Sequence, residues 1–450
     1  MTPGRSCAFG TDGIRGRVGL PPLTPEILVR LGYALGKVLG SPDAEVIIGK
    51  DTRLSGYMVE SSIEAGLAAA GINVALTGPL PTSAVARLAA EEGAAAGIVV
   101  SASHNPYQDN GIKVFDAAGA KLSDDQEKRI EQIVAQGEPQ WEAEPGKARR
   151  IDDACERYIR FCVASEPQAQ LADLKIVADA ANGSAYHCLP EVLRRCGAEV
   201  VAIGNEPDGR NINVDCGVLA PEAARRAVAE HGADCAVVVD GDADRLLLID
   251  AAGHLLDGDA CLYLMCRALA AAGNPPPGVV GTLMSNGALA GALAGMGIDF
   301  ARSAVGDRNV AALLRAKGWP LGGEPSGHLL LPQRHPTGDG ILAALAVLAS
   351  VVQLGETLAE AVSSYQPLPQ AVVSVAAADP AAAADDLASA AATAEAEAQV
   401  ARVLVRPSGT EPVVRILVEA ETAAAARQAA EQLAAKIESR NCLSAAGGTA

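Results

Sequence analysis

Short apolar runs rich in β-branched residues alternate with amphipathic stretches up to about residue 350. Such alternation predicts strands followed by helices, as in parallel-sheet α/β units. The elements expected in the first region are strand 45–48, helix 56–70, strand 72–76, helix 82–92, strand 97–100 and a helix from Ser123, which forms a capping-box pattern with Gln126.

The same plan recurs twice before the pattern changes. The second region is expected to hold strand 175–178, helix 185–195, strand 199–203, helix 221–231 and strand 235–239. The third is expected to hold strand 279–283 and helices 310–316 and 338–351, and the last to hold strands near 372–375, 403–405 and 413–418 with an Ala-rich helix at 381–398. We therefore predict three similar α/β domains (1–150, 151–252 and 253–368) and a smaller α+β domain (369–450), with the polar stretch 136–149 as the first linker.

Composition narrows the classes of protein that this chain can belong to. Hydrophobic residues make up 49% of the 450 residues, enough for several aliphatic cores. The 54 acidic side chains outnumber the 36 basic ones, which gives a formal charge of −18, and aromatic residues are only 3%. An acidic chain repels nucleic acid and anionic membranes, and few aromatics remain for stacking on bases. We expect neither partner.

The cysteines and the apolar segments bear on the cellular location. The ten cysteines are scattered, and Cys188, Cys235 and Cys261 lie in apolar patterns that indicate buried thiols. The first ten residues lack the apolar core of a secretory signal. The apolar run 341–352 is far shorter than the roughly 20 residues that cross a bilayer. We expect a reduced protein of the cytoplasm.

A serine–histidine motif, residues 101–106, directly follows the apolar run 97–100. Loops at the carboxyl ends of parallel strands are where open α/β sheets bind ligands, and a serine beside a histidine can be a nucleophile. We expect Ser103 in this role rather than Ser101, which still belongs to the strand end. The alternative is a simple turn, because Ser, Asn and Pro all favour turns.

Three carboxylates alternate along the chain after the apolar run 237–239: Asp240, Asp242 and Asp244. Placed together behind a buried strand, they would repel one another unless a cation lay between them. Oxygen ligands suit Mg²⁺, which typically binds few carboxylates and shares a phosphate oxygen. An EF-hand loop is excluded, because Arg245 stands at its sixth position. The pattern favours a metal site over a solvated acidic turn.

A glycine-rich stretch at 322–328 carries groups suited to sugar hydroxyls. Gly322 and Gly323 allow the backbone to approach a ligand closely, and Glu324, Ser326 and His328 supply hydrogen-bond acceptors and donors. The alternative is a glycine-rich turn between strands.

A second turn, residues 406–412, combines arginines with hydroxyl groups. Arg406 precedes it, Ser408, Gly409 and Thr410 lie within it, and Arg415 follows on the next strand. Guanidinium groups and a row of backbone N–H groups make a phosphate cradle. The alternative is a hairpin that carries surface arginines. Glycine-rich turns at 10–16 and 50–53 contribute further cations.

These four motifs, in this order, resemble the α-D-phosphohexomutase family over essentially the whole chain. The residues that carry the resemblance are 9–16, 103–106 with 109–113, 211–213 with 216–217, 306–308 and 337–340. Within the family they look most like the bacterial members that isomerise glucosamine phosphates.

The resemblance implies a fold, a reaction and a role for each motif. It implies four domains around a central cleft, and conversion of glucosamine 6-phosphate to glucosamine 1-phosphate through a phosphoserine enzyme and a bisphosphorylated sugar, for the synthesis of UDP-N-acetylglucosamine. The implied roles are phosphorylation of Ser103; one Mg²⁺ held by Asp240, Asp242, Asp244 and the Ser103 phosphate; sugar contacts from Glu324, Ser326 and His328; and distal phosphate binding by Arg406, Ser408, Gly409, Thr410 and Arg415. We also expect Arg15 among the catalytic groups, Arg245 and Arg308 among the substrate-binding groups, and His104 or Lys113 as the proton-transfer or charge-stabilising group.

Some questions stay open at this point. Pro325 stands in the sugar loop where amino-sugar members usually carry Gln, and because Pro fixes φ and removes a donor we expect it to shift Glu324 and blur the sugar preference. The alternatives are a phosphomannomutase/phosphoglucomutase of the same family, an aspartyl-phosphate phosphatase with Asp240 as nucleophile, and a non-catalytic sugar-phosphate binding protein. The sequence is compatible with a homodimer as well as with a monomer.

Overall fold

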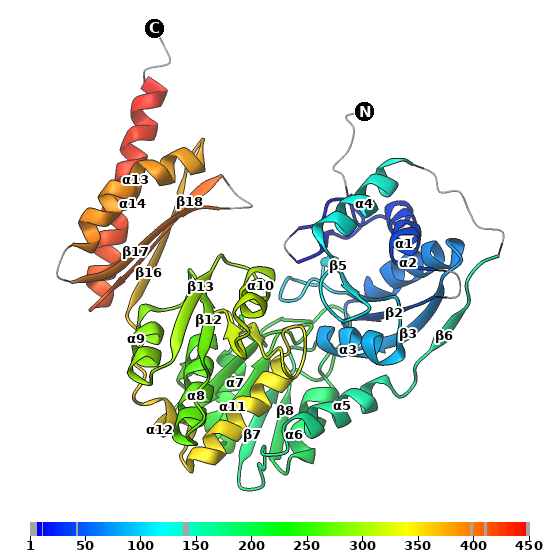
Figure 1. Ribbon diagram of the computed structural model, residues 1–450, viewed down its shortest axis with the longest axis horizontal. Helices are drawn as coiled ribbons and strands as arrows, with labels where there is room; N and C mark the ends of the chain where they lie inside the picture. The colour runs from blue at the N-terminus through cyan, green and yellow to red at the C-terminus, as the bar shows by residue number, and fades with distance from the viewer. Residues whose placement is uncertain are drawn as a thin grey trace. The chain divides into compact units, whose positions relative to one another are not determined.

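The computed structural model describes residues 7–10, 12–41, 44–137, 144–396, 399–408 and 412–446, with the backbone alone from 439 onward (Figure 1). Contacts divide the chain into two compact units. The first consists of Met1–Thr282 and Ile298–Ser363, and the second of Leu283–Gly297 and Ser364–Ala450. None of the helices described is long and apolar enough to cross a membrane.

The first sheet has six strands in the order β1-β5-β4-β2-β3-β6. Its strands are β1 (Ile14–Arg17), β2 (Glu45–Lys50), β3 (Asn73–Pro79), β4 (Ala96–Val100), β5 (Asp109–Asp116) and β6 (Ala148–Arg150). Helices α1 (Pro25–Leu39), α2 (Gly56–Ala69) and α4 (Asp124–Ala135) share one apolar core with the sheet, and α3 (Thr82–Glu92) packs on β4. α1 and α2 can approach closely because residue 66 is a glycine. A Cβ at this position would lie 2.1 Å from the Val29 carbonyl oxygen.

The second sheet has five strands in the order β11-β10-β9-β7-β8. Its strands are β7 (Lys175–Asp179), β8 (Glu199–Ile203), β9 (Cys235–Val239), β10 (Leu246–Asp250) and β11 (Leu255–Leu256), and the helices of this region are α5 (Ala154–Ser165), α6 (Cys188–Arg195) and α7 (Glu222–His231). β9 is buried along its whole length, as its apolar sequence predicts. Its carboxyl end therefore delivers the Asp240 loop to the interior of the unit.

The third sheet has four strands in the order β13-β12-β14-β15. Its strands are β12 (Gly278–Thr282), β13 (Asp299–Ser303), β14 (Leu321–Gly323) and β15 (Leu329–Leu330), and its helices are α8 (Gly258–Ala271), α10 (Asp307–Lys317), α11 (Gly340–Leu354) and α12 (Leu358–Val362). α11 is apolar on nearly every side and correspondingly buried. β14 and β15 flank the predicted sugar loop.

The second unit is built on an antiparallel three-stranded sheet in the order β16-β18-β17. Its elements are β16 (Gln370–Ala376), β17 (Val400–Pro407), β18 (Val413–Ala420), α13 (Pro380–Glu395), α14 (Ala423–Ala446) and α9 (Gly287–Gly295). Small residues of α13 and α14 pack against the sheet, so the alanine-rich composition makes a core here.

The predicted elements are confirmed with small shifts, and three differences have physical causes. The first three sheets are mixed rather than parallel, because β5, β10 and β15 return antiparallel beside β4, β9 and β14. The helix expected from 185 begins at Cys188, which places Pro190 in the first turn, where its missing N–H costs nothing. The end of the stretch expected as linker forms β6, which pairs with β3.

Candidate active site

The serine motif and the acidic motif meet at the ends of β4 and β9. The Ser103 hydroxyl donates a hydrogen bond to Asp240 Oδ2, and Ser103 is only 1% exposed. A Cβ on Gly241 would lie 2.6 Å from the Ser103 carbonyl oxygen, so only glycine lets the two loops touch. Ser103 itself has a φ of 52°, in the left-handed region that non-glycine residues rarely adopt. Such a residue is typical of a functional turn.

The three aspartates form a buried oxygen cluster that fits a divalent cation. Carboxylate oxygens of Asp240, Asp242 and Asp244 all lie within 4.8 Å of one another. Asp242 Oδ1 and Asp244 Oδ1 are buried and have no hydrogen-bond partner among the described residues. Burial, with the negative charges of Asp244 and Asp242, raises the pKa of Asp240 to about 8. A bound Mg²⁺ would accept the unpaired carboxylate oxygens as ligands and would offset the repulsion between the three negative charges. The residues present therefore fit this ion.

Lys113, on β5, is the cation nearest to this cluster. Its Nζ lies 2.8 Å from Asp242 Oδ2, 2.7 Å from Asp244 Oδ2 and 3.2 Å from Asp12 Oδ2. Burial alone would lower the pKa of Lys113, but these carboxylates hold it well above the usual value. Lys113 therefore stays protonated, which suits charge stabilisation better than proton abstraction.

His104 has the opposite character. Its Nδ1 lies 3.2 Å from the Ser103 Oγ, within reach for a proton transfer. Burial, together with the positive charges of Arg245 and Arg15, lowers the pKa of His104 to about 4. A neutral imidazole at this distance is able to accept the proton of the serine hydroxyl.

A chain of charged residues extends from Lys113 toward the sugar loop. Lys121 Nζ lies 2.8 Å from Asp12 Oδ1 and 2.7 Å from Asp307 Oδ2. His328 is within 3.7 Å of Asp244 and 3.6 Å of Asp307. Burial works against a charged His328, but the negative charges of the nearby Asp244 and Asp307 raise its pKa to about 9.

The predicted arginines of the first unit have different surroundings. Arg15 is paired with Asp12 beside Lys113. Arg245 directs its backbone N–H to Asp240 Oδ1 at 3.2 Å and is partly buried next to the aspartate cluster. Arg308 instead forms ion pairs with Asp124 and Glu127 of α4. Arg15 and Arg245 are thus close to Ser103, while in this arrangement α4 holds Arg308.

The sugar loop is a tight turn in which Pro325 fits well. The Gly327 N–H donates to the Glu324 carbonyl at 3.0 Å, so Pro325 occupies the second position of the turn, where proline is favoured and no N–H is needed. The Glu324 carboxylate accepts from the Gly306 N–H at 2.9 Å. Ser326 is exposed and His328 is buried. The loop geometry gives no sign that Pro325 displaces Glu324.

The predicted phosphate cradle lies on the β17–β18 hairpin of the second unit. Arg406 and Arg415 stand directly opposite each other in the strand register, and the Ser408 N–H closes the turn on the Val413 carbonyl at 2.9 Å. Burial and the charge of Arg415 lower the pKa of Arg406. Like charges opposite each other destabilise a strand pair, so this hairpin is suited to an anion. Gly409 and Thr410, also predicted here, lie outside the described residues.

Sequence reasoning missed several residues that complete the site. The Thr82 hydroxyl donates to Asp242 Oδ2 at 2.5 Å, and Asn213 Nδ2 donates to the Ser103 carbonyl at 2.9 Å. Asp12 and Lys121 link the first domain to Asp307. The glycine-rich turn around Asp12 and the motif 211–213, which contains Asn213, were usable signals, whereas Thr82 and Lys121 stand in ordinary amphipathic surroundings.

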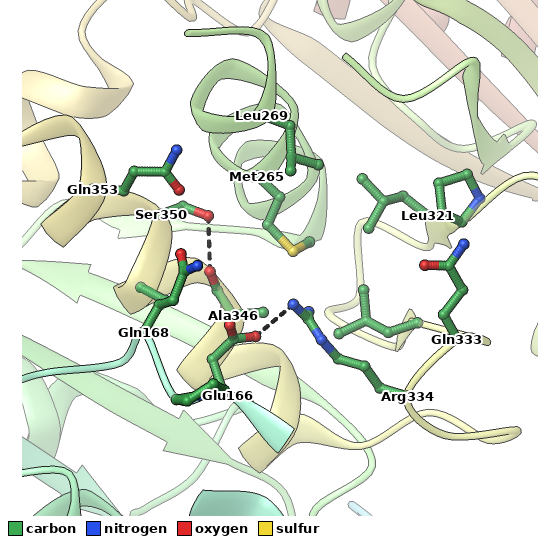
Figure 2. Close-up of a pocket in the computed structure, with 14 residues that line it drawn as sticks. Glu166, Gln168, Met265, Leu269, Leu321, Gln333, Arg334, Ala346, Ser350 and Gln353 are labelled. Carbon is green, nitrogen blue, oxygen red and sulfur yellow. Dashed lines mark hydrogen bonds and ion pairs between the residues drawn. The ribbon is translucent and has the colours of Figure 1, made fainter. Parts of the chain in front are cut away.

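A separate cavity of about 300 Å³ lies between α8, α11 and the segment after β15 (Figure 2). Met265, Leu269 and Leu321 give it apolar walls. Its two charged lining residues, Glu166 and Arg334, are paired with each other at 2.6 Å. The residues around Ser103 are not among those that line it, so this cavity is not part of the site.

Comparison with known proteins agrees with this arrangement. Over 443 residues the chain is 50% identical to a Chromobacterium violaceum protein named phosphoglucosamine mutase, covering 96% of this chain and 98% of that protein. Its fold matches a solved phosphoglucomutase/phosphomannomutase family protein from Burkholderia thailandensis at 24% identity (TM-score 0.77, 98% of both chains). It also matches an Aspergillus fumigatus N-acetylphosphoglucosamine mutase, solved with GlcNAc-6P and magnesium, at 20% identity (TM-score 0.68, 96% of both chains).

The match extends over all four domains of one family. Residues 6–141, 156–253 and 257–368 match its alpha/beta/alpha domains I, II and III, and residues 371–436 match its C-terminal domain. Three α/β domains followed by a C-terminal domain are the predicted fold class, which is thereby confirmed. The chain belongs to the phosphoglucomutase/phosphomannomutase family.

Proposed function

We propose that this protein interconverts glucosamine 6-phosphate and glucosamine 1-phosphate. The observation that carries the proposal is the contact between the Ser103 hydroxyl and the buried aspartate cluster, at a site with Lys113 and His104 beside it. The name of the Chromobacterium relative supports the amino sugar as substrate. A product of this kind would serve the synthesis of UDP-N-acetylglucosamine.

The reaction needs a phosphoryl group to leave one end of the sugar and appear at the other. Phosphorylated Ser103 donates its phosphoryl to the free sugar hydroxyl: the P–O bond to the serine breaks, one to the sugar forms, and the proton of the sugar hydroxyl passes to the Ser103 oxygen, which gives a bisphosphorylated sugar. After this intermediate turns over, Ser103 Oγ accepts the other phosphoryl and loses its hydroxyl proton. Neutral His104, with Nδ1 at 3.2 Å, takes that proton and passes it to the sugar oxygen from which the phosphoryl departs.

The charges around Ser103 stabilise the transferring phosphoryl. Lys113 supplies a fixed positive charge, and such positioning and electrostatics account for most of phosphoryl-transfer catalysis. Asp240, Asp242 and Asp244, with an oxygen on Ser103, would hold one Mg²⁺. When bound, this ion would neutralise negative charge on the phosphoryl group. The Aspergillus mutase solved with magnesium supports the choice of metal.

The remaining predicted residues receive the sugar and its second phosphate. Glu324, Ser326 and His328 bind hydroxyl and amino groups of the sugar, and Arg245 and Arg15 bind the phosphoryl near Ser103. Arg308 can join them once it leaves its partners on α4. We assign the non-reacting phosphate to Arg406, Ser408, Gly409, Thr410 and Arg415.

We place the enzyme in the cytoplasm, where its described cysteines stay reduced. Each of these is a free thiol, which suits a reducing compartment. Its partner is the small hexosamine phosphate, with no nucleic acid or membrane bound. Light scattering would decide between monomer and homodimer.

A side-by-side assay of glucosamine, glucose and mannose phosphates tests the function. We expect the highest kcat/KM with glucosamine phosphate and a lower rate with glucose phosphate, because extra hydrogen-bonding groups of similar size discriminate modestly. Intact-mass measurement of the protein from cells should show a fraction about 80 Da heavier, the mass of a phosphoryl group. A higher kcat/KM for the mannose or glucose phosphates would replace the proposal by the phosphomannomutase/phosphoglucomutase activity.

A further inference from the structure

Arg53, between β2 and α2, is a fully buried arginine whose role the reaction above leaves unassigned. Its side chain is 0% exposed, and its only charged partner among the described residues is Asp51, where Arg53 Nε meets Asp51 Oδ2 at 2.8 Å. The guanidinium donates its other hydrogen bonds to backbone carbonyls of the serine loop: Ser103 and Asn105 at 2.8 Å each, Pro106 at 2.5 Å and Asp109 at 3.1 Å. All five donors of the group are therefore used.

Asp51 holds the other side of the same peptide. Its Oδ2 accepts the Ser101 hydroxyl at 2.6 Å, and Ser101 Oγ in turn accepts the Ser103 N–H at 2.9 Å. The N–H and the carbonyl of Ser103 are thus both fixed by one buried pair, directly at Arg53 and through Ser101 from Asp51.

The conformation that this pair fixes is the one that aims the reactive oxygen. Ser103 has a φ of 52°, which typically costs about 1–3 kcal/mol unless the surroundings determine it. In this conformation the hydroxyl points at Asp240. We infer that Arg53 and Asp51 are positioning residues for Ser103: Arg53 acts directly and Asp51 acts through Ser101. Together they hold the serine loop in its left-handed turn for phosphoryl transfer. This inference rests on the proposed mutase reaction.

Ser101→Ala and Arg53→Lys test the inference. Ser101→Ala removes a single hydrogen bond from the Ser103 N–H, while lysine at position 53 cannot reproduce the five-donor fork. A misplacement of about 1 Å costs on the order of 100-fold in rate. We expect kcat to fall about 10-fold in Ser101→Ala and about 100-fold in Arg53→Lys, with KM unchanged within about threefold because neither residue touches the sugar. The ³¹P resonance of the phosphoserine should also shift.

The control is Ser350→Ala, which removes another buried serine hydroxyl, one bonded to Ala346 on α11. It should keep the wild-type kcat and ³¹P resonance. If Arg53→Lys fails to fold, Ser101→Ala still decides. A wild-type kcat and resonance in folded Ser101→Ala, beside an active wild type, would overturn the positioning role. An inactive wild type would instead count against the proposed function.

A second inference concerns two cysteines far from Ser103 in the sequence. Cys155 of α5 and Cys188, the first residue of α6, place their sulfur atoms 3.2 Å apart. Cys155 is partly exposed and Cys188 is 1% exposed. The hydrogen bond from Cys188 lowers the pKa of Cys155. A partly exposed thiol with a lowered pKa beside a second thiol is the arrangement of a peroxide-sensitive pair.

We propose that Cys155 and Cys188 form a site of oxidation by hydrogen peroxide. The Cys155 thiolate attacks one peroxide oxygen, so that an S–O bond forms, the O–O bond breaks and hydroxide leaves. The Cys188 thiol then attacks the sulfenic sulfur: an S–S bond forms, the S–O bond breaks, and the oxygen leaves as water with the thiol proton. The hydroxide takes up the proton that Cys155 released on ionising, so two thiols are oxidised and one peroxide is reduced to two waters.

Peptide mapping after limited peroxide treatment of the full chain tests this site. We expect a cross-linked Cys155–Cys188 peptide as the first disulfide, reversed by dithiothreitol. In Cys188→Ser, Cys155 should instead be trapped as sulfenic acid by dimedone, whereas the control Cys235→Ser, at a buried thiol of β9, should form the cross-link as the wild type does. The proposal would be overturned if other cysteines of the native protein oxidised before this pair.

Discussion

Lys113 is the cation that neutralises the buried carboxylates, and its removal should expose their repulsion. Its side chain is 3% exposed, and its ammonium nitrogen lies within 3.2 Å of three carboxylates. Removing one partner of a buried ion pair typically costs about 3–5 kcal/mol. At about 2–4 °C per kcal/mol for domains of roughly 150–250 residues, Lys113→Met should lower the melting temperature in EDTA by roughly 6–20 °C.

Magnesium should restore more stability to this variant than to the wild type. In the wild type the ammonium group occupies oxygens of Asp242 and Asp244, so the ion must compete with it. A ligand at about 100 times its Kd raises the free energy of unfolding by roughly 2.7 kcal/mol. Because Lys113→Met should bind Mg²⁺ more tightly, its melting temperature should rise more than that of the wild type. Differential scanning fluorimetry over a Mg²⁺ series measures both effects, with Lys128→Met on the exposed side of α4 as the matched control. Equal melting temperatures in EDTA, or equal Mg²⁺ shifts, would refute the reasoning.

Three further predictions concern the groups that carry or bind phosphate. Ser103→Ala should lower kcat by several orders of magnitude and should abolish the protein fraction that is about 80 Da heavier. Full activity of this variant would mean that another residue is the nucleophile. EDTA should abolish the mutase activity, and adding Mg²⁺ should restore it. Activity that persists after exhaustive chelation would contradict the metal site. Arg406→Met or Arg415→Met should cost about 1.5–3 kcal/mol, roughly 10- to 100-fold in kcat/KM, with both the 1-phosphate and the 6-phosphate; an effect on one substrate alone would indicate separate phosphate sites.

The sequence was informative wherever a group of functional residues is contiguous. An apolar strand followed by a polar loop predicted where Ser103 and Asp240 would lie, because the burial of β4 and β9 and the loops that follow them are local properties. The capping box at Ser123 was predicted for the same reason and is confirmed. The domain boundaries at 150, 252 and 368 stay predictions.

Partners distant in sequence could not be predicted in this way. Lys113 was singled out only for its closeness to Ser103, while its three carboxylate partners come from residues 12, 242 and 244. That pairing depends on β5 inserting antiparallel between β1 and β4, which no local pattern indicated. Arg53 read as one more cation in a polar turn, and only the fold shows that its guanidinium lies beneath the serine loop.

The sugar preference depends on Glu324, and the turn geometry leads to a specific expectation for its neighbour. Pro325 occupies a turn position that needs no N–H, and its carbonyl accepts from the Gly258 N–H at 3.2 Å, as any residue could. Pro325→Gln should therefore change the kcat/KM ratio of glucosamine to glucose phosphate by less than about threefold, a difference of less than about 1 kcal/mol. Glu324→Gln should lower that ratio about 10-fold or more, because a neutral amide loses the attraction of the carboxylate for an ammonium group. Assays of both variants on both sugars measure these ratios. A large change in Pro325→Gln with little change in Glu324→Gln would mean that loop shape, rather than the charge of Glu324, selects the sugar.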